Sequence, residues 1–156
     1  MNSNVLVSNI TELLRNRNET LSLAESCTGG LISAEIVRRP GVSDVYLGAV
    51  VSYADSLKAQ VLGVNSKSLE EFGAVSREVA IEMAQGARVA LNSNWSIAVT
   101  GVAGPTGGTA EKPVGTVWIS VIGPEYLDTQ VYKFDGDREM VQNQTLVQAL
   151  KNLSLA

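Results

Sequence analysis

Short apolar runs of strand length alternate along the chain with segments of helical periodicity, and this alternation limits the fold more than any other feature of the sequence. Such alternation favours helices packed on a sheet, because each kind of element has an apolar side to bury against the other. The last two strand-like runs are joined at Gly123-Pro124, which is typical of a hairpin. We therefore predict an α/β layered domain with a mixed sheet, since a hairpin adds antiparallel strands to parallel ones.

The individual elements follow from apolar spacing and from the residues that start and stop them. Helices are expected over 4–17, 29–39, 55–62 and 77–91, with one or two helical turns at 66–72 and a final helix capped by Asp135 or Asp137. Strands are expected over 20–25, 45–53, 95–100, 114–122 and 126–134. The run from 45 to 53 is almost continuously apolar, so we expect this strand to be buried.

Composition excludes several classes of protein. The length of 156 residues predicts one domain, covering 1–156. The net charge of −4 argues against a protein that binds duplex nucleic acid, which usually needs a basic face. A membrane-spanning helix needs roughly 18 or more consecutive apolar residues, and the sequence has no such run. The N-terminus does not resemble a signal peptide and the single cysteine fits a reducing compartment, so a cytoplasmic protein is expected.

The sequence contains no histidine. This excludes Ser-His-Asp and Cys-His catalysis and every histidine-ligated metal site. One cysteine is too few for a thiolate zinc site, so no metal is expected. Acid–base chemistry would have to come from Lys, Tyr, Asp, Glu or the substrate itself.

In open α/β sheets, ligands bind beyond the carboxyl ends of the strands, and three strand ends here carry unusual polar residues. The first strand runs into Glu25-Ser26-Cys27-Thr28-Gly29-Gly30 just before a helix. Free backbone N–H groups at such a turn favour an anion or a developing oxyanion, and a hydroxyl beside a thiol suggests a nucleophile. The same residues also suit a simple helix cap with glycines that ease the turn, so this segment alone leaves both interpretations open.

The second strand end places Tyr53 before a helix that carries Lys58. A lysine near a nucleophile acts as a base when burial or positive surroundings lower its pKa, although most lysines are simply solvated. In a chain without histidine, a Ser-Lys pair is an alternative arrangement. Ser26 would then attack and Lys58 would accept its proton. Tyr53 would orient the lysine or relay a proton to the leaving group.

The third strand end is a glycine-rich loop from Thr100 to Gly115. Its glycines and threonines suit close backbone approach to a phosphate, although the spacing matches neither a Walker A loop nor GxGxxG. A flexible connector explains the composition equally well. The candidate substrate-binding residues of the first and third strand ends are Thr28, Gly29, Gly30, Thr100, Gly101, Gly104, Gly107, Gly108 and Lys112.

Cys27 is the alternative nucleophile, because a thiolate forms more readily at a helix N-terminus. Glu25 and Lys58 would then complete a Cys-Lys-Glu amidase. Adjacent residues that leave a strand point different ways, so only one of Ser26 and Cys27 easily faces a pocket. We favour Ser26, since free cysteines are usually buried.

Several sequence blocks, in order, resemble the CinA C-terminal-domain family, the nicotinamide-nucleotide amidases. The opening block is Ala24 to Gly30, and the resemblance covers nearly the whole chain. The further blocks are Ser52-Tyr53 with Lys58, Leu62-Gly63-Val64, Gly73-Ala74-Val75-Ser76, Met83-Ala84, Gly86-Ala87-Arg88, Thr100 to Pro105, Lys112 to Val117 and Gly136-Asp137-Arg138. Separate blocks in order are more specific than any one of them.

The resemblance implies a three-layer α/β/α fold with a mixed, mostly parallel sheet of about five strands, related to anticodon-binding-like domains. It implies hydrolysis of nicotinamide mononucleotide to nicotinate mononucleotide and ammonia, a step of pyridine-nucleotide salvage, without a metal or organic cofactor. Ser26 matches the family's serine nucleophile, with Lys58 and Tyr53 as its partners. The expected partner is thus a small-molecule nucleotide, not nucleic acid or a membrane. Apolar residues at 45–51 allow a homodimer or a higher homo-oligomer.

Two positions depart from the family pattern. Asp55 stands where the family often has Asn, which adds a negative charge near Lys58 that would raise its pKa. Gln142 stands near a position where the last helix often carries Arg, which would weaken a phosphate or subunit contact. These departures keep a second class of function open, a nucleotide-binding or partner module with little or no catalysis.

Overall fold

The computed structural model describes residues 2–156. The elements in that range are, in chain order, α1 (Ser3–Arg17), β1 (Leu21–Glu25), α2 (Leu31–Val37), β2 (Tyr46–Val51), α3 (Asp55–Leu62), α4 (Ser66–Phe72), α5 (Arg77–Leu91), β3 (Trp95–Gly101), β4 (Thr116–Gly123), β5 (Tyr126–Lys133) and α6 (Arg138–Ser154). None of the helices in this part of the chain is both long and apolar enough to span a bilayer.

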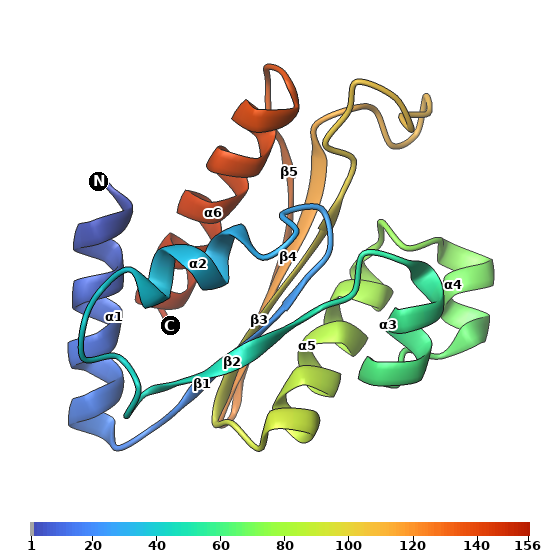
Figure 1. Cartoon of the computed structure of the whole chain (residues 1–156). Helices are drawn as coiled ribbons and strands as arrows, with labels where there is room; N and C mark the ends of the chain where they lie inside the picture. The colour runs from blue at the N-terminus through green and yellow to red at the C-terminus, as the bar shows by residue number, and fades with distance from the viewer. Residues whose placement is uncertain (1) are drawn as a thin grey trace.

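The five strands form one mixed sheet in the order β2-β1-β3-β4-β5. β1 pairs in parallel with both β2 and β3, whereas β4 is antiparallel to β3 and to β5. Helices α1, α2 and α6 lie on one face of the sheet, and α3, α4 and α5 lie on the other (Figure 1). The predicted α/β class, the mixed five-stranded sheet and the terminal hairpin are therefore confirmed.

Side-chain caps explain where the longer helices begin. The Asn2 side chain accepts a hydrogen bond from Val5 N at the start of α1, and the Ser76 hydroxyl accepts one from Val79 N at the start of α5. Of the two candidate caps for the final helix, Asp137 is the one used, because its carboxylate accepts a hydrogen bond from Met140 N at 2.9 Å. Both α1 and α5 end where an asparagine, Asn18 or Asn92, adopts the left-handed conformation.

One prediction about the sheet is wrong. The strand expected to be buried, 45–53, is the shorter edge strand β2, and Leu47 and Val51 on it are 45% and 43% exposed. The neighbouring strand β1 lies inside the sheet, and its five residues are all buried. An apolar run is compatible with a strand inside the sheet or at its edge. Here the helix α2 is short, and part of the edge strand β2 stays exposed.

A close contact of main-chain atoms sets the distance between α3 and α5. Gly86 lies in the middle of α5, and a Cβ at this position would lie 1.9 Å from the Leu62 carbonyl oxygen at the end of α3. The absent side chain at Gly86 therefore lets the two helices approach closely. Because α3 carries Lys58, this contact also helps to place the predicted base.

We predict that Gly86→Ala destabilises the protein even though alanine is the better helix former. The helix propensity of alanine contributes about 1 kcal/mol in favour of the variant. The clash with the Leu62 carbonyl costs about 3 kcal/mol, at the upper end for overpacking, so we expect the free energy of unfolding to fall by about 2 kcal/mol.

Chemical denaturation of the wild type and the variant measures this change. Gln85→Ala is the matched control, because Gln85 is the exposed neighbour of Gly86 in the same helix and its replacement should change stability little. A Gly86→Ala variant that is as stable as the Gln85→Ala variant would show that α3 shifts freely away from α5.

Candidate active site

A pocket of about 400 Å³ lies beyond the carboxyl ends of the three parallel strands β1, β2 and β3. Its walls come from the turn after β1, Tyr53 and the first half of α3, the segment between α4 and α5, and the end of β3 with the loop that follows it. Arg138 at the start of α6 completes the lining. The pocket therefore brings together the three polar strand ends that the sequence singled out.

Ser26 lines the pocket from the turn that follows β1 and is 8% exposed. Its backbone N–H donates to the Val99 carbonyl of β3, and its carbonyl accepts the Gly29 N–H. Glu25, which is fully buried, stabilises this turn through its carboxylate. The Glu25 carboxylate accepts hydrogen bonds from the Thr28 hydroxyl at 2.6 Å and from Ile32 N and Ser33 N in the first turn of α2.

Glu25 thus supplies the cap that α2 lacks, because Gly30 at its N-cap position has no side chain to accept a hydrogen bond. Gly29 and Gly30 have φ angles of 61° and 105°, which favour glycine. Thr28, Gly29 and Gly30 shape the turn without lining the pocket. Of the predicted oxyanion donors, the Gly29 N–H is already bound to the Ser26 carbonyl.

Cys27 is buried and packs with the apolar core, although it also contributes to the lining of the pocket. Burial raises the pKa of the Cys27 thiol to about 12, so the thiol carries its proton at neutral pH. Its backbone carbonyl accepts a hydrogen bond from Gln142 Nε2 of α6 at 3.0 Å. These features favour Ser26 over Cys27 as the nucleophile, and they give Gln142 a contact with the turn that carries Ser26.

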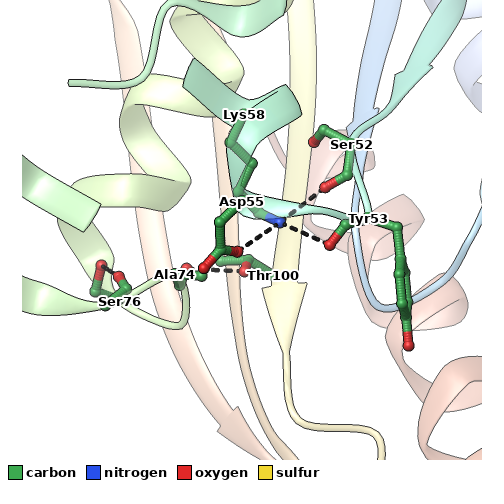
Figure 2. Close-up of polar contacts among 8 residues, drawn as sticks. Ser52, Tyr53, Asp55, Lys58, Ala74, Ser76 and Thr100 are labelled. Atoms are coloured by element: carbon green, nitrogen blue, oxygen red, sulfur yellow. Dashed lines mark hydrogen bonds and ion pairs between the residues drawn. The ribbon is translucent and has the colours of Figure 1, made fainter. Parts of the chain in front are cut away.

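Lys58 is a buried lysine whose side chain is 1% exposed. Its Nζ donates to the Ser52 carbonyl at 2.7 Å and the Tyr53 carbonyl at 3.3 Å, and it lies 3.4 Å from Asp55 Oδ1 (Figure 2). Burial lowers the pKa of Lys58 from its ordinary value, and the nearby Asp55 carboxylate opposes this shift. Ser26 and Lys58 line the same pocket, but within residues 2–156 no hydrogen bond joins Ser26 Oγ to Lys58 Nζ.

The Tyr53 side chain points away from the Lys58 ammonium (Figure 2). Figure 2 shows its backbone oxygen facing Lys58 and its ring extending away. The Tyr53 hydroxyl accepts a hydrogen bond from Arg138 Nη2 at 2.9 Å, and Arg138 Nη1 donates to the Gly104 carbonyl at 2.6 Å. Arg138 therefore joins the strand end after β2 to the loop after β3.

The glycine-rich loop is divided between the pocket and the surface. Thr100, Gly101, Gly104 and Gly107 line the pocket, and the Thr100 hydroxyl donates to the Ala74 carbonyl of the opposite wall (Figure 2). Gly108 and Lys112 do not line it. The Lys112 ammonium donates to the Phe72 carbonyl at the end of α4.

Arg138 is the pocket residue that reasoning from the strand ends missed. Arg138 lies after the β4–β5 hairpin, far along the chain from the other lining residues, and it does not follow the end of a parallel strand. The Gly136-Asp137-Arg138 block was available as a signal, because it places a basic side chain directly after a helix cap. Within residues 2–156 no group of three or more His, Cys, Asp or Glu side chains is placed to hold a metal ion.

Comparison with known proteins gives a consistent result. A family model described as the CinA C-terminal domain matches residues 3–156. A CinA-like protein of Fervidobacterium nodosum is 50% identical over 144 residues, which is 92% of this chain and 35% of that protein. A CinA-like protein of Nostoc sp. is 51% identical over 124 residues, which is 80% of this chain and 29% of that protein. The chain thus spans much less than half the length of these relatives.

Solved structures match over almost their full length. The competence damage-inducible protein A of Klebsiella pneumoniae superposes with a TM-score of 0.96 at 34% identity, over 99% of this chain and 96% of that one. The competence/damage inducible protein CihA of Agrobacterium tumefaciens gives a TM-score of 0.93 at 37% identity, over 97% and 93% of the two chains. The match over 3–156 and these relatives together show that the chain belongs to the CinA C-terminal domain family.

Proposed function

We propose that this domain is a serine amidase that hydrolyses the carboxamide of nicotinamide mononucleotide. The observation that carries this proposal is that Ser26 and a buried lysine with a lowered pKa, Lys58, line one pocket in a chain without histidine. A lysine whose pKa is lowered by burial spends more time as a neutral amine, which is the form that accepts a proton. The family resemblance supplies the substrate.

In the proposed reaction, Ser26 Oγ bonds to the amide carbon while its proton passes to the neutral amine of Lys58. The tetrahedral intermediate then collapses, the C–N bond breaks, and the Lys58 ammonium returns the proton to the nitrogen, which leaves as ammonia. Water next attacks the ester on Ser26 and gives its proton to Lys58. That proton returns to Ser26 Oγ as the ester bond breaks and nicotinate mononucleotide leaves.

The other end of the pocket suits the phosphate. Arg138 offers a guanidinium there, beside the backbone of Gly104, and Gly107 lines the same pocket. Arginine binds phosphate through two parallel hydrogen bonds, and glycines permit close backbone approach. We therefore assign the phosphate to Arg138 and the glycine loop, with Tyr53 placing the guanidinium through its hydroxyl. Lys112, the other predicted phosphate ligand, has its ammonium on the Phe72 carbonyl.

A binding module with little catalysis is the second candidate. It is favoured by the contacts of Lys58, whose Nζ faces three oxygen acceptors and makes no hydrogen bond with Ser26 within the described residues. Such a module would gain thermal stability with nicotinamide mononucleotide but release no ammonia. Ammonia release by the purified wild-type protein separates the two candidates.

We predict that Ser26→Ala lowers ammonia release by about 10³-fold or more, because the variant has no nucleophile. Cys27→Ala should stay within a few-fold of the wild type, since the thiol is buried and protonated. Both are measured as ammonia and nicotinate mononucleotide produced by purified protein. An active Ser26→Ala variant with an inactive Cys27→Ala variant would assign the reaction to the thiol.

We predict that both Lys58→Arg and Lys58→Met lower kcat by about 10²–10⁴-fold, the usual contribution of a general base. Arginine keeps the positive charge but does not give up its proton near neutral pH, so it cannot act as the base. Thermal stabilisation by the nucleotide checks that each variant still folds and binds. If Lys58→Arg retained most of its activity, Lys58 would be a binding cation instead of a base.

We predict that Arg138→Gln raises KM for nicotinamide mononucleotide by about 10–100-fold, as expected for the loss of a charged hydrogen-bonding partner. Nicotinamide riboside, which has no phosphate, should be affected little by the same change. Lys112→Gln is the matched control and should leave both KM values near the wild type. An equal loss with both substrates would mean that Arg138 serves only to hold Tyr53 and Gly104.

A further inference from the structure

Asp55 and Lys58 form an ion pair whose two side chains differ in exposure. They lie in the part of the pocket where the proposed reaction takes place. Both residues line it, and Asp55 Oδ1 lies 3.4 Å from Lys58 Nζ. The Lys58 side chain is 1% exposed, whereas that of Asp55 is 64% exposed. The carboxylate is therefore free to turn towards whatever enters the pocket, while the lysine is fixed in place.

This pair poses a problem for the proposed reaction. Lys58 must be a neutral amine to accept the Ser26 proton, but an adjacent carboxylate favours the ammonium. The other ionisable groups around Lys58 are Cys27 in the turn after β1, Tyr53 after β2 and Arg138 at the start of α6. The segments 74–75 and 100–107 contribute no ionisable side chain to the pocket. Asp55 is thus the only carboxylate among the lining residues.

The substrate class brings a second cation to this end of the pocket. In the oxidised nicotinamide nucleotides the carboxamide is attached directly to a pyridinium ring, which carries a permanent positive charge. Ser26, Asp55 and Lys58 line one pocket, so in the proposed complex a ring whose amide carbon reaches Ser26 is placed beside the Asp55–Lys58 pair. Two cations then compete for one carboxylate, and only the ammonium is able to lose its charge.

We infer that Asp55 exchanges partners when substrate binds: it is the counter-ion of the Lys58 ammonium in the free protein and of the pyridinium ring in the complex, and Lys58 releases a proton to solvent as the ring enters. Asp55 is then a specificity-determining residue that selects amides on cationic rings. The cationic substrate itself produces the neutral base. This inference rests on the proposed function, because it takes its substrate class from there.

The exchange is measured as proton release on binding. Isothermal titration calorimetry of the Ser26→Ala protein, in buffers of different ionisation enthalpy between about pH 6 and pH 9, counts protons released without turnover. Nicotinamide mononucleotide should release up to about one proton per molecule bound at the pH where Lys58 is charged in the free protein. The 1,4-dihydro form of the same nucleotide has a neutral ring and should release almost none.

The Asp55→Asn change, made in the Ser26→Ala protein, tests the carboxylate with an isosteric side chain. It should weaken binding of the oxidised nucleotide about 10-fold and that of the dihydro nucleotide less than about twofold. Without Asp55 the pKa of Lys58 falls further below its ordinary value. The acid limb of kcat/KM in the Asp55→Asn protein that retains Ser26 should therefore move to lower pH.

Glu78→Gln is the matched control, because Glu78 is also an acidic residue in the first turn of a helix but does not line the pocket. It should leave proton release and both affinities unchanged. Binding of the oxidised nucleotide without proton release at any pH, or equal weakening of both ring forms by Asp55→Asn, would overturn the inference and leave the proposed amidase standing. Absence of binding by either nucleotide would instead overturn the proposed substrate, and the inference with it.

Discussion

The parallel pairing of β1 with both β2 and β3 is the constraint on which the pocket depends. In this register Glu25 at the end of β1 lies beside Val51 of β2 and Val99 of β3. The chain therefore leaves all three strands at nearly the same level, and the residues that follow meet at one edge of the sheet. Ser26, Tyr53 and Thr100 share a pocket because of this pairing, although they are far apart in the sequence.

The same logic explains how much of the site could be predicted from the sequence. Apolar runs that stop at polar or glycine-rich segments mark the ends of strands, and parallel strands bring those ends together. This located Ser26, Tyr53, Lys58, Thr100 and three of the loop glycines, all of which line the pocket. Helices 55–62, 66–72 and 77–91 were also predicted with the observed bounds, because capping residues and glycines mark their ends.

The features that the sequence did not predict depend on the path of the chain in space. Arg138 reaches the pocket because the β4–β5 hairpin returns the chain to the site, which no local pattern records. Lys112 was assigned to phosphate by its position in the loop, yet the loop directs its ammonium to the Phe72 carbonyl. Similarly, the apolar run of β2 fits a central strand as well as an edge strand, and hydrophobicity alone does not distinguish the two.

The contact between Gly86 and Leu62 has a consequence for how such a domain diverges. Because the contact involves the backbone carbonyl of α3 and a residue without a side chain, substitutions on the exposed surfaces of these two helices do not alter it. The surface of α3 and α5 is therefore free to vary while Lys58 stays in place. Arg138, in contrast, reaches the pocket through a long side chain. Redesign for a different substrate is thus easier at the Arg138 end of the pocket than at the Lys58 end.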